Sequence, residues 1–341
     1  MNTQNNLISN RKDAHLALSL NPDLRGNGPD LSHVHLPYAA HFPIPESKLI
    51  TNTKIADIPL NFPLVIASMT GGTHAASKFN SFLRSVAQKY NIGLGLGSIR
   101  ACLADPSLIP TYGSGDAPWI FGNIGISEII HQSYPVDVIR ESLKKLGCSG
   151  LYIHFNVIQE WLQPEGDHDL FTDIDILSRF IDNLKLPVIL KEVGSGIAGN
   201  AAKRLSHLNI RGIETASKSG TSWVKIEALR RHPPLPPDFV DALDQLGYDL
   251  QTCIRDCRIA LGPRSLIASG GIDNPLSLVK SLALGADAVA IAQPVYAAYH
   301  NLGPDYASQW IQDIMNISKL IWRSTGAHNI SSLRNIVESN H

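Results

Sequence analysis

Short apolar runs recur along the chain, and amphipathic segments separate them. Eight of these runs are continuous rather than alternating, at 63–68, 92–97, 119–123, 151–156, 187–192, 212–216, 265–269 and 288–292. A continuous run indicates a strand buried on both faces, as in a parallel sheet covered by helices. Helical segments follow most of the runs, at 77–90, 136–147, 171–184, 198–208, 222–232 and 274–285. This alternation predicts an α/β fold, a (β/α)8 TIM barrel.

The same pattern predicts how the chain is divided. Residues 1–50 precede the first strand and are expected to form an N-terminal arm or cap, and residues 51–341 a single barrel domain. The longest interval lies between the sixth and seventh strands, and it contains the proline-rich stretch "RRHPPLPPD" (230–238). Because no helix runs through such a stretch, we expect a mobile excursion at about 230–262, with one or two added helices near 239–261.

Composition narrows the class of protein. The chain has 341 residues, 44% of them hydrophobic, with 29 basic and 30 acidic residues and no block of like charge. This argues against nucleic acid or a membrane surface as a partner. The start "MNTQNNLISN" has no apolar signal core, and no apolar run is long enough to span a bilayer. We therefore expect a cytoplasmic protein whose four cysteines are ordinary thiols.

The residues at the ends of the predicted strands are polar or glycine-rich. In chain order they read "SMTGG", "GSIRA", "GNIG", "HFNVIQE", "KEVGSG", "ASKSGTSW", "SGGI" and "AQP". Because barrel chemistry collects at the carboxyl ends of the strands, these groups are expected to meet at one mouth. Gly270 and Gly271, after the seventh strand, are placed for the phosphate site common in such barrels. The alternative is that these glycines merely turn the chain.

Two charged features suggest further anion chemistry. Lys191 ends a strand and is expected to point into the mouth, where its ammonium needs an anion. That anion is either Glu192 or a ligand such as a reduced flavin. A second anion site is predicted from Arg100 at a strand end, His154, and the basic residues of "NRKDAHL", which are Arg11, Lys12 and His15. For the arm residues, a solvated helix start is the alternative.

Glu160 lies in the polar segment "HFNVIQEWLQPEGD" (154–167), which begins with His154. Magnesium favours one or two carboxylates together with phosphate oxygens, so Glu160 is a candidate to hold a divalent cation against bound phosphates. A structural ion pair is the alternative. A diphosphate lying beside a cofactor phosphate accounts for both anion sites.

Taken together, the motifs resemble one family, the type 2, flavin-dependent isopentenyl-diphosphate isomerases. The matching segments cover nearly the whole chain and include "RKDAH", "ASMTGG", "GSIRA", "GNIG", "HFNVIQEWLQPEGD", "KEVGSG", "GTSWVKIEALR", "ASGGIDNP" and "ALGADAVAIAQP". The combination is specific, whereas "ASGGI" alone would indicate only a flavin- or phosphate-binding barrel. The resemblance implies conversion of isopentenyl to dimethylallyl diphosphate, with FMN reduced by NADPH and acting as acid and base without net redox change.

The resemblance also implies roles for individual residues. The residues that would line FMN are Ala67, Ser68, Met69, Ser98, Asn123, Lys191, Thr221, Gly270, Gly271 and Ala292. Those that would hold the substrate diphosphate are Arg11, Lys12, His15, Arg100, His154, Asn156 and Gln159, with Glu160 on Mg2+. The catalytic set would be Gln159, Glu227, Lys191 and Trp223, of which Trp223 and Glu227 match positions at the hydrocarbon end of the substrate. A homo-oligomer, either a tetramer or an octamer, is also implied.

Two departures from the family pattern leave alternatives open. Ser217 and Ser219 stand where the family has loop glycines, so FMN affinity falls if a positive φ or a close approach is needed there. Ile99 replaces a glutamine, which puts the exact substrate in doubt if that position lies beside it. The alternatives are a flavin oxidoreductase or related enzyme on another small prenyl or phosphorylated substrate, and a flavin-impaired barrel without catalysis.

Overall fold

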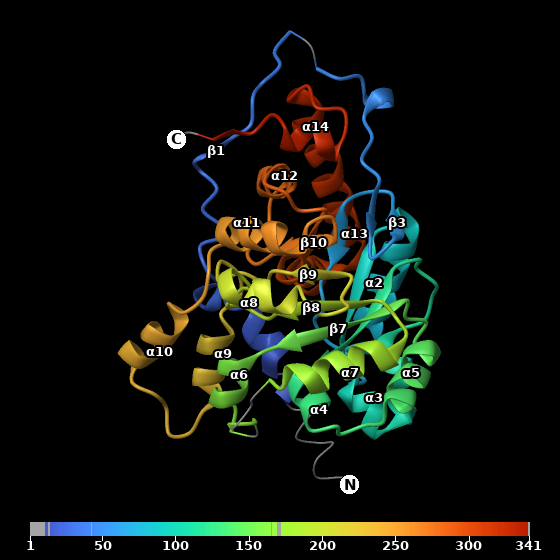
Figure 1. Cartoon of the computed structure of the whole chain (residues 1–341), viewed down its shortest axis with the longest axis vertical. Helices are drawn as coiled ribbons and strands as arrows, with labels where there is room; N and C mark the ends of the chain where they lie inside the picture. The colour runs from blue at the N-terminus through green and yellow to red at the C-terminus, as the bar shows by residue number, and fades with distance from the viewer. Residues whose placement is uncertain (1–10, 13, 42, 165, 169–171, 340–341) are drawn as a thin grey trace.

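A closed parallel barrel forms the centre of the computed structural model, which describes residues 11–12, 14–41, 43–164, 166–168 and 172–339 (Figure 1). Within these residues the barrel has eight strands: β4 (Leu64–Ile66), β5 (Gly93–Ser98), β6 (Ile120–Gly125), β7 (Gly150–Phe155), β8 (Val188–Glu192), β9 (Gly212–Glu214), β10 (Ser265–Ser269) and β11 (Ala288–Ile291). Neighbouring strands pair in parallel, and β10 and β11 join β9 to β4 to close the ring. All eight predicted strands and the barrel class are confirmed.

Two apolar layers explain why the strand sequences are continuous rather than alternating. Inward-facing side chains such as Val65, Phe121 and Ile189 fill the inside of the barrel, and outward-facing ones pack under the helices. The amino end of the barrel is plugged by a hairpin of β2 (Thr53–Ile55) and β3 (Ile58–Leu60), which the sequence analysis did not anticipate. The hairpin is held there because the indole N–H of Trp119 donates to the carbonyl of Ile55 at 3.0 Å. The opposite end remains available for a site.

Helices cover the barrel as predicted. The barrel helices are α2 (Ser77–Tyr90), α5 (Val136–Lys145), α7 (Ile174–Leu184), α8 (Gly199–Leu205), α11 (Leu250–Leu261) and α12 (Pro275–Ala283). Shorter helices follow β5, β6 and β7 at the mouth: α3 (Arg100–Ala104), α4 (Ile126–Ile130) and α6 (Val157–Leu162). A long α13 (Gln293–Ser324), interrupted at Gly303 (φ 89°) before Pro304, was not predicted. No helix among the described residues has the length and apolar character to cross a membrane.

The interval between the sixth and seventh strands holds three helices. After α9 (Trp223–Arg230) the proline-rich stretch separates it from α10 (Pro237–Asp244), which begins with a proline at its first position. The expectation of an added helix holds for α10. The second helix near 239–261 is α11, which packs against β10 and α8 in the manner of a regular barrel helix. The mobility of this interval stays a prediction.

The N-terminal arm runs along the outside of the barrel. Residues 14–19 are helical, and η1 (Pro22–Leu24) packs near α9. β1 (Val34–His35) pairs with β12 (Glu338–Ser339), which follows α14 (Ile330–Arg334) in the chain. Figure 1 shows this blue segment running from the region of α9 to the end of the molecule that also holds α14. The arm therefore contacts the mouth at one end and the C-terminal segment at the other.

Candidate active site

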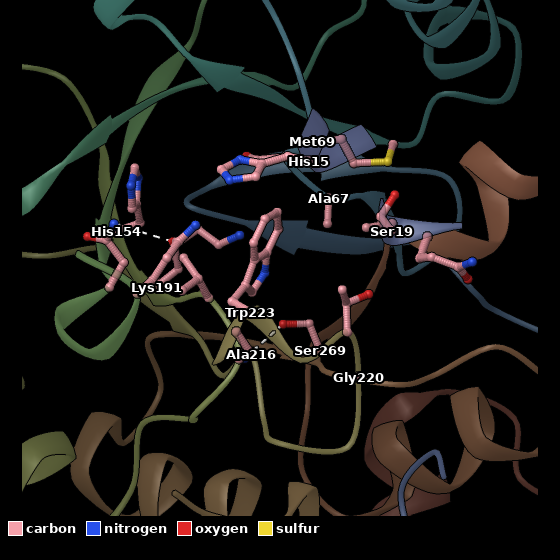
Figure 2. Close-up of a pocket in the computed structure, with 18 of the residues that line it drawn as sticks. His15, Ser19, Ala67, Met69, His154, Lys191, Ala216, Gly220, Trp223 and Ser269 are labelled. Carbon is pink, nitrogen blue, oxygen red and sulfur yellow. Dashed lines mark hydrogen bonds between the residues drawn. The ribbon is translucent and has the colours of Figure 1, made fainter. Parts of the chain in front are cut away.

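A cavity of about 270 Å³ opens where the barrel strands end. Figure 2 shows His154, Lys191, Trp223 and Ser269 converging on it from different strands and loops, with His15 of the arm facing them. The sequence-predicted residues that line it are Arg11, Lys12, His15, Ala67, Ser68, Met69, Ser98, Arg100, Asn123, His154, Asn156, Gln159, Glu160, Lys191, Thr221, Trp223, Gly270, Gly271 and Ala292. Glu227 lies behind this lining, fully buried. The polar strand ends thus meet at one mouth, as predicted.

The glycine pair after β10 forms part of a cradle for an anion. Gly270 and Gly271 have φ of 110° and 75°, and a Cβ on Gly271 would lie 2.3 Å from the carbonyl oxygen of Ser219. The N-terminus of α13, which lacks a side-chain cap, opens onto the same part of the cavity. Pro294 carries no N–H, and the N–H of Val295 donates to the carbonyl of Ala292 at 3.1 Å. It is therefore the positive end of the helix dipole that favours a phosphate there. The side-chain oxygen of Gln293 is buried without a partner among the described residues.

The loop that contains Ser217 and Ser219 has no backbone strain at either serine. Neither Ser217 nor Ser219 has a positive φ, whereas the preceding Ala216 does, at 45°. Ser217 is buried, and its hydroxyl donates to the carbonyl of Gly270 at 3.4 Å. The arm covers this loop, since the N–H of Gly26 donates to the carbonyl of Gly220 at 2.7 Å. The backbone therefore accommodates both serines.

Lys191 is paired with a carboxylate that the sequence analysis did not consider. Its Nζ lies 3.2 Å from Oε1 of Glu214, and both side chains are buried. The alternative that Glu192 is the partner of Lys191 is wrong, because successive residues of a strand face opposite sides of the sheet. The Glu192 carboxylate instead accepts backbone N–H groups of the following loop, including those of Val193 and Gly194 at 2.7 and 2.6 Å. Burial raises the pKa of Glu192, an effect that these N–H groups oppose.

His154 is a neutral imidazole in this cavity. Its Nδ1 lies 2.7 Å from Oδ1 of Asn123, so Nδ1–H donates and Nε2 is left as an acceptor. Burial, together with the positive charges of Lys191, Arg100 and Arg11, lowers the pKa of His154 to about 3. A bound anion would offset those positive charges and raise this pKa.

Glu227 is the centre of a hydrogen-bond network behind the cavity. Its Oε1 accepts from the side-chain amides of Gln159 and Gln163, each at 3.0 Å, and lies 2.8 Å from Nε2 of His15. Arg230 contacts the other carboxylate oxygen. Burial opposes ionisation of Glu227, but the hydrogen bonds from His15 and Gln159 and the charges of His15 and Arg230 hold its pKa below the usual value. Glu227 is therefore an ionised carboxylate at neutral pH.

The arm cations are held by the barrel. Arg11 donates to Oε1 of Gln163 at 2.9 Å, and Nζ of Lys12 donates to the carbonyls of Gly71 and, at 3.3 Å, Ser98. These contacts place both cations at the lining of the cavity.

Glu160, the predicted metal residue, also lines the cavity. Glu160 accepts from Nδ2 of Asn156 at 2.9 Å, and Oδ1 of Asn156 is buried without a partner among the described residues. A second carboxylate, Glu128, lines the cavity and pairs with Arg100 at 3.1 Å. No cluster of three or more histidine, cysteine or acidic ligands is found in the described ranges. The donors present fit Mg2+ only in its usual phosphate-assisted mode.

Ile99 does not occupy the position expected from the sequence. It is fully buried in the apolar core and is absent from the described residues that line the cavity. The expectation that it alters the substrate region is therefore wrong.

Comparisons with known proteins show the family to which the chain belongs. No family model matches the chain. It is 31% identical to an isopentenyl-diphosphate delta-isomerase of Ignicoccus hospitalis, covering 94% of this chain and 90% of that protein. It is 32% identical to the enzymes of the same name from Mycobacterium marinum, covering 96% of each chain, and Chlorobium luteolum, covering 98% of this chain and 96% of that protein. The chain belongs to the isopentenyl-diphosphate delta-isomerase family.

This membership confirms the resemblance of the sequence motifs. Solved structures add support for the fold. A mandelate oxidase variant with a C4a-OH-FMN adduct superimposes with a TM-score of 0.64 at 14% identity, covering 96% of this chain and 98% of that one. A mandelate oxidase with (S)-2-phenylpropionate gives a TM-score of 0.63 at 16% identity, covering 96% of each chain. At such low identity these matches show the barrel architecture and nothing about the substrate.

Several residues of the site were missed in the sequence. Glu214 lies beside Lys191 because β8 and β9 pair in that register, and a charged residue inside the predicted buried strand "GIETA" was the available signal. Gln163 belongs to the polar motif after β7, but its bond to Glu227 depends on how α6 and α9 pack. Gln293 belongs to the strand end "AQP" but was given no role, and nothing in the local sequence marked Arg25 and Glu128, which also line the cavity.

Proposed function

We propose that this protein isomerises isopentenyl diphosphate to dimethylallyl diphosphate, with FMN in the barrel mouth and Mg2+ on the diphosphate. One observation carries the proposal: the glycine cradle beneath the α13 N-terminus and the arm cations lie on the same cavity. One anion site would hold the cofactor phosphate, and the other the substrate diphosphate. Family membership supports this assignment, since the relatives bear the name of that activity.

The residues present fit FMN. Ser68 Oγ, Glu214 Oε2 and Gln293 Oε1 are buried in the cavity lining without partners among the described residues, which is expected of groups that await a polar ligand. Lys191 would face the flavin ring, and Gly270, Gly271 and the α13 N-terminus its phosphate, with the remaining lining from Ala67, Ser68, Met69, Ser98, Asn123, Thr221 and Ala292. Reduced FMN, when bound, would supply a proton and a negative charge beside the alkene.

The chain itself would bind, orient and shield the substrate. Arg11, Lys12, His15, Arg100, His154, Asn156 and Gln159 would hold the diphosphate, and Glu160 would hold Mg2+ against it. Trp223, whose ring contacts that of His15 at 5.1 Å between centroids, would cover the hydrocarbon end and exclude water. Glu227 accepts the side-chain amide of Gln159 at 3.0 Å, and the two residues would relay protons as a secondary contribution beside the flavin.

Activity and metal dependence test the proposal together. Purified protein incubated anaerobically with FMN, NADPH, Mg2+ and isopentenyl diphosphate is expected to form dimethylallyl diphosphate. Glu160→Gln should raise the Mg2+ concentration for half-maximal rate about tenfold or more, while Glu46→Gln, an exposed control, should not change it. The absence of product from the unmodified protein would contradict the proposal.

Further properties form part of the same proposal. NADPH would serve as the reductant that prepares FMN, and the protein would act in the cytoplasm as a tetramer or octamer. Residues 1–50 would behave as an arm on a single barrel domain, and the interval at 230–262 would be mobile. Limited proteolysis tests the mobility of the interval, and size-exclusion chromatography with light scattering tests the oligomeric state.

A further inference from the structure

Lys191 and Glu214 form a buried ion pair in the cavity proposed to hold FMN, whose own charge changes on reduction. Lys191 and Glu214 are partners in the register of β8 and β9, and their side chains are 8% and 1% exposed. Both line the cavity. Reduced flavin carries a negative charge that oxidised flavin lacks, so any fixed charge at this place favours one redox state over the other.

Glu214 is the carboxylate that opposes the Lys191 charge. Its Oε1 lies 3.2 Å from the ammonium of Lys191 and accepts a hydrogen bond from the hydroxyl of Ser269 at 3.2 Å. Its Oε2 is buried without a partner among the described residues. The ring of Tyr152 lies 5.5 Å from the same Nζ, and burial, together with the charge of the neighbouring Glu214, raises the pKa of Tyr152. Lys191 thus contacts one aromatic ring and one carboxylate, and the two opposite charges sum to zero.

A paired ammonium attracts a ligand anion less than a lone ammonium does. At a distance larger than their separation, the two charges act as a dipole whose field falls off faster than that of a single charge. We propose that Glu214 is a positioning residue that moderates the preference of Lys191 for reduced over oxidised FMN, so that both redox states stay bound. This inference rests on the proposed FMN function.

The quantity that reports this role is the ratio of the dissociation constant of oxidised FMN to that of reduced FMN. Both constants are measured by anaerobic titration, with dithionite-reduced FMN for the second. Glu214→Gln keeps the shape and removes the charge, and it should raise the ratio about tenfold or more. For a two-electron couple each tenfold change corresponds to about 30 mV, so the midpoint potential of bound FMN should rise by that amount.

Three further variants make the test specific. Lys191→Met should lower the ratio about tenfold, because it leaves the Glu214 charge uncompensated. The double variant Lys191→Met with Glu214→Gln should return to within about threefold of the unmodified protein, since a buried pair and its neutral replacement carry the same net charge. Glu141→Gln removes the same charge from an exposed pair with Lys145 and should leave the ratio unchanged.

The measured ratios decide whether Glu214 has this role. An unchanged ratio in Glu214→Gln, or a double variant that matches Lys191→Met, would overturn the inference. If Glu214→Gln does not fold, as judged by circular dichroism, the comparison of Lys191→Met with the double variant still isolates the Glu214 charge, and equal ratios overturn the inference. Failure of the unmodified protein to bind FMN in either state would remove the proposed function as well. Binding with a ratio insensitive to Glu214 would remove only the inference.

Discussion

Nε2 of His15, on the N-terminal arm, lies 2.8 Å from Oε1 of Glu227, on α9 of the barrel. The contact joins residues 212 positions apart and brings a side chain of the arm onto a fully buried carboxylate (227 minus 15). The same carboxylate is bonded to Gln159 and Gln163, so the arm, α6 and α9 share one network. The arm is therefore part of the wall of the cavity.

Loss of the His15 contact is expected to weaken substrate binding while leaving the barrel folded. His15→Ala should raise KM for isopentenyl diphosphate about tenfold or more, because the imidazole both faces the diphosphate region and fixes Glu227. The measurement is steady-state kinetics with saturating FMN. His207→Ala, at an exposed position, is the matched control. Unchanged KM and kcat in His15→Ala would remove the arm from the site.

The glycine cradle offers a second test. Gly271→Ala would place a methyl group 2.3 Å from the Ser219 carbonyl at a φ of 75°, so FMN affinity should fall at least tenfold. Gly262→Ala has a comparable φ of 59° but open space around it, and serves as the control for backbone strain alone. Fluorescence titration with FMN measures both. Equal affinities in the two variants would argue against a phosphate at this cradle.

Replacing the two loop serines by glycine is not expected to improve FMN binding. Because Ser217 and Ser219 have no positive φ, the double change Ser217→Gly and Ser219→Gly should leave FMN affinity within about threefold of the unmodified protein. Equilibrium titration of FMN measures this. A tenfold gain in affinity would show that the serine side chains impair the site after all.

The depressed pKa of His154 has a consequence for stability. In the unfolded chain a histidine takes up a proton near pH 6.5, whereas the folded pKa of His154 is about 3. Between these values the unfolded state binds more protons, so the free energy of unfolding should fall as pH drops from about 6.5 towards 3. His154→Asn should flatten this slope in urea titrations from pH 4 to 8. An identical slope in the variant would mean that His154 is not held neutral.

The strand pattern could be predicted because each barrel strand is buried on both faces and therefore continuous in sequence. The plug of β2 and β3 escaped prediction because its three-residue strands are too short to show periodicity. Site residues at strand ends could be found from their position alone. Contacts such as Lys191 with Glu214 and His15 with Glu227 could not, since the register of paired strands and the path of the arm decide them.

The most direct test of the central claim is the number of dimethylallyl diphosphate molecules formed per NADPH consumed. The assay contains protein, FMN, Mg2+ and excess isopentenyl diphosphate under anaerobic conditions, with NADPH limiting. If the cavity holds a reduced flavin that serves as acid and base without net redox change, many products should form for each NADPH. A ratio of one, or no product at all, would contradict the account.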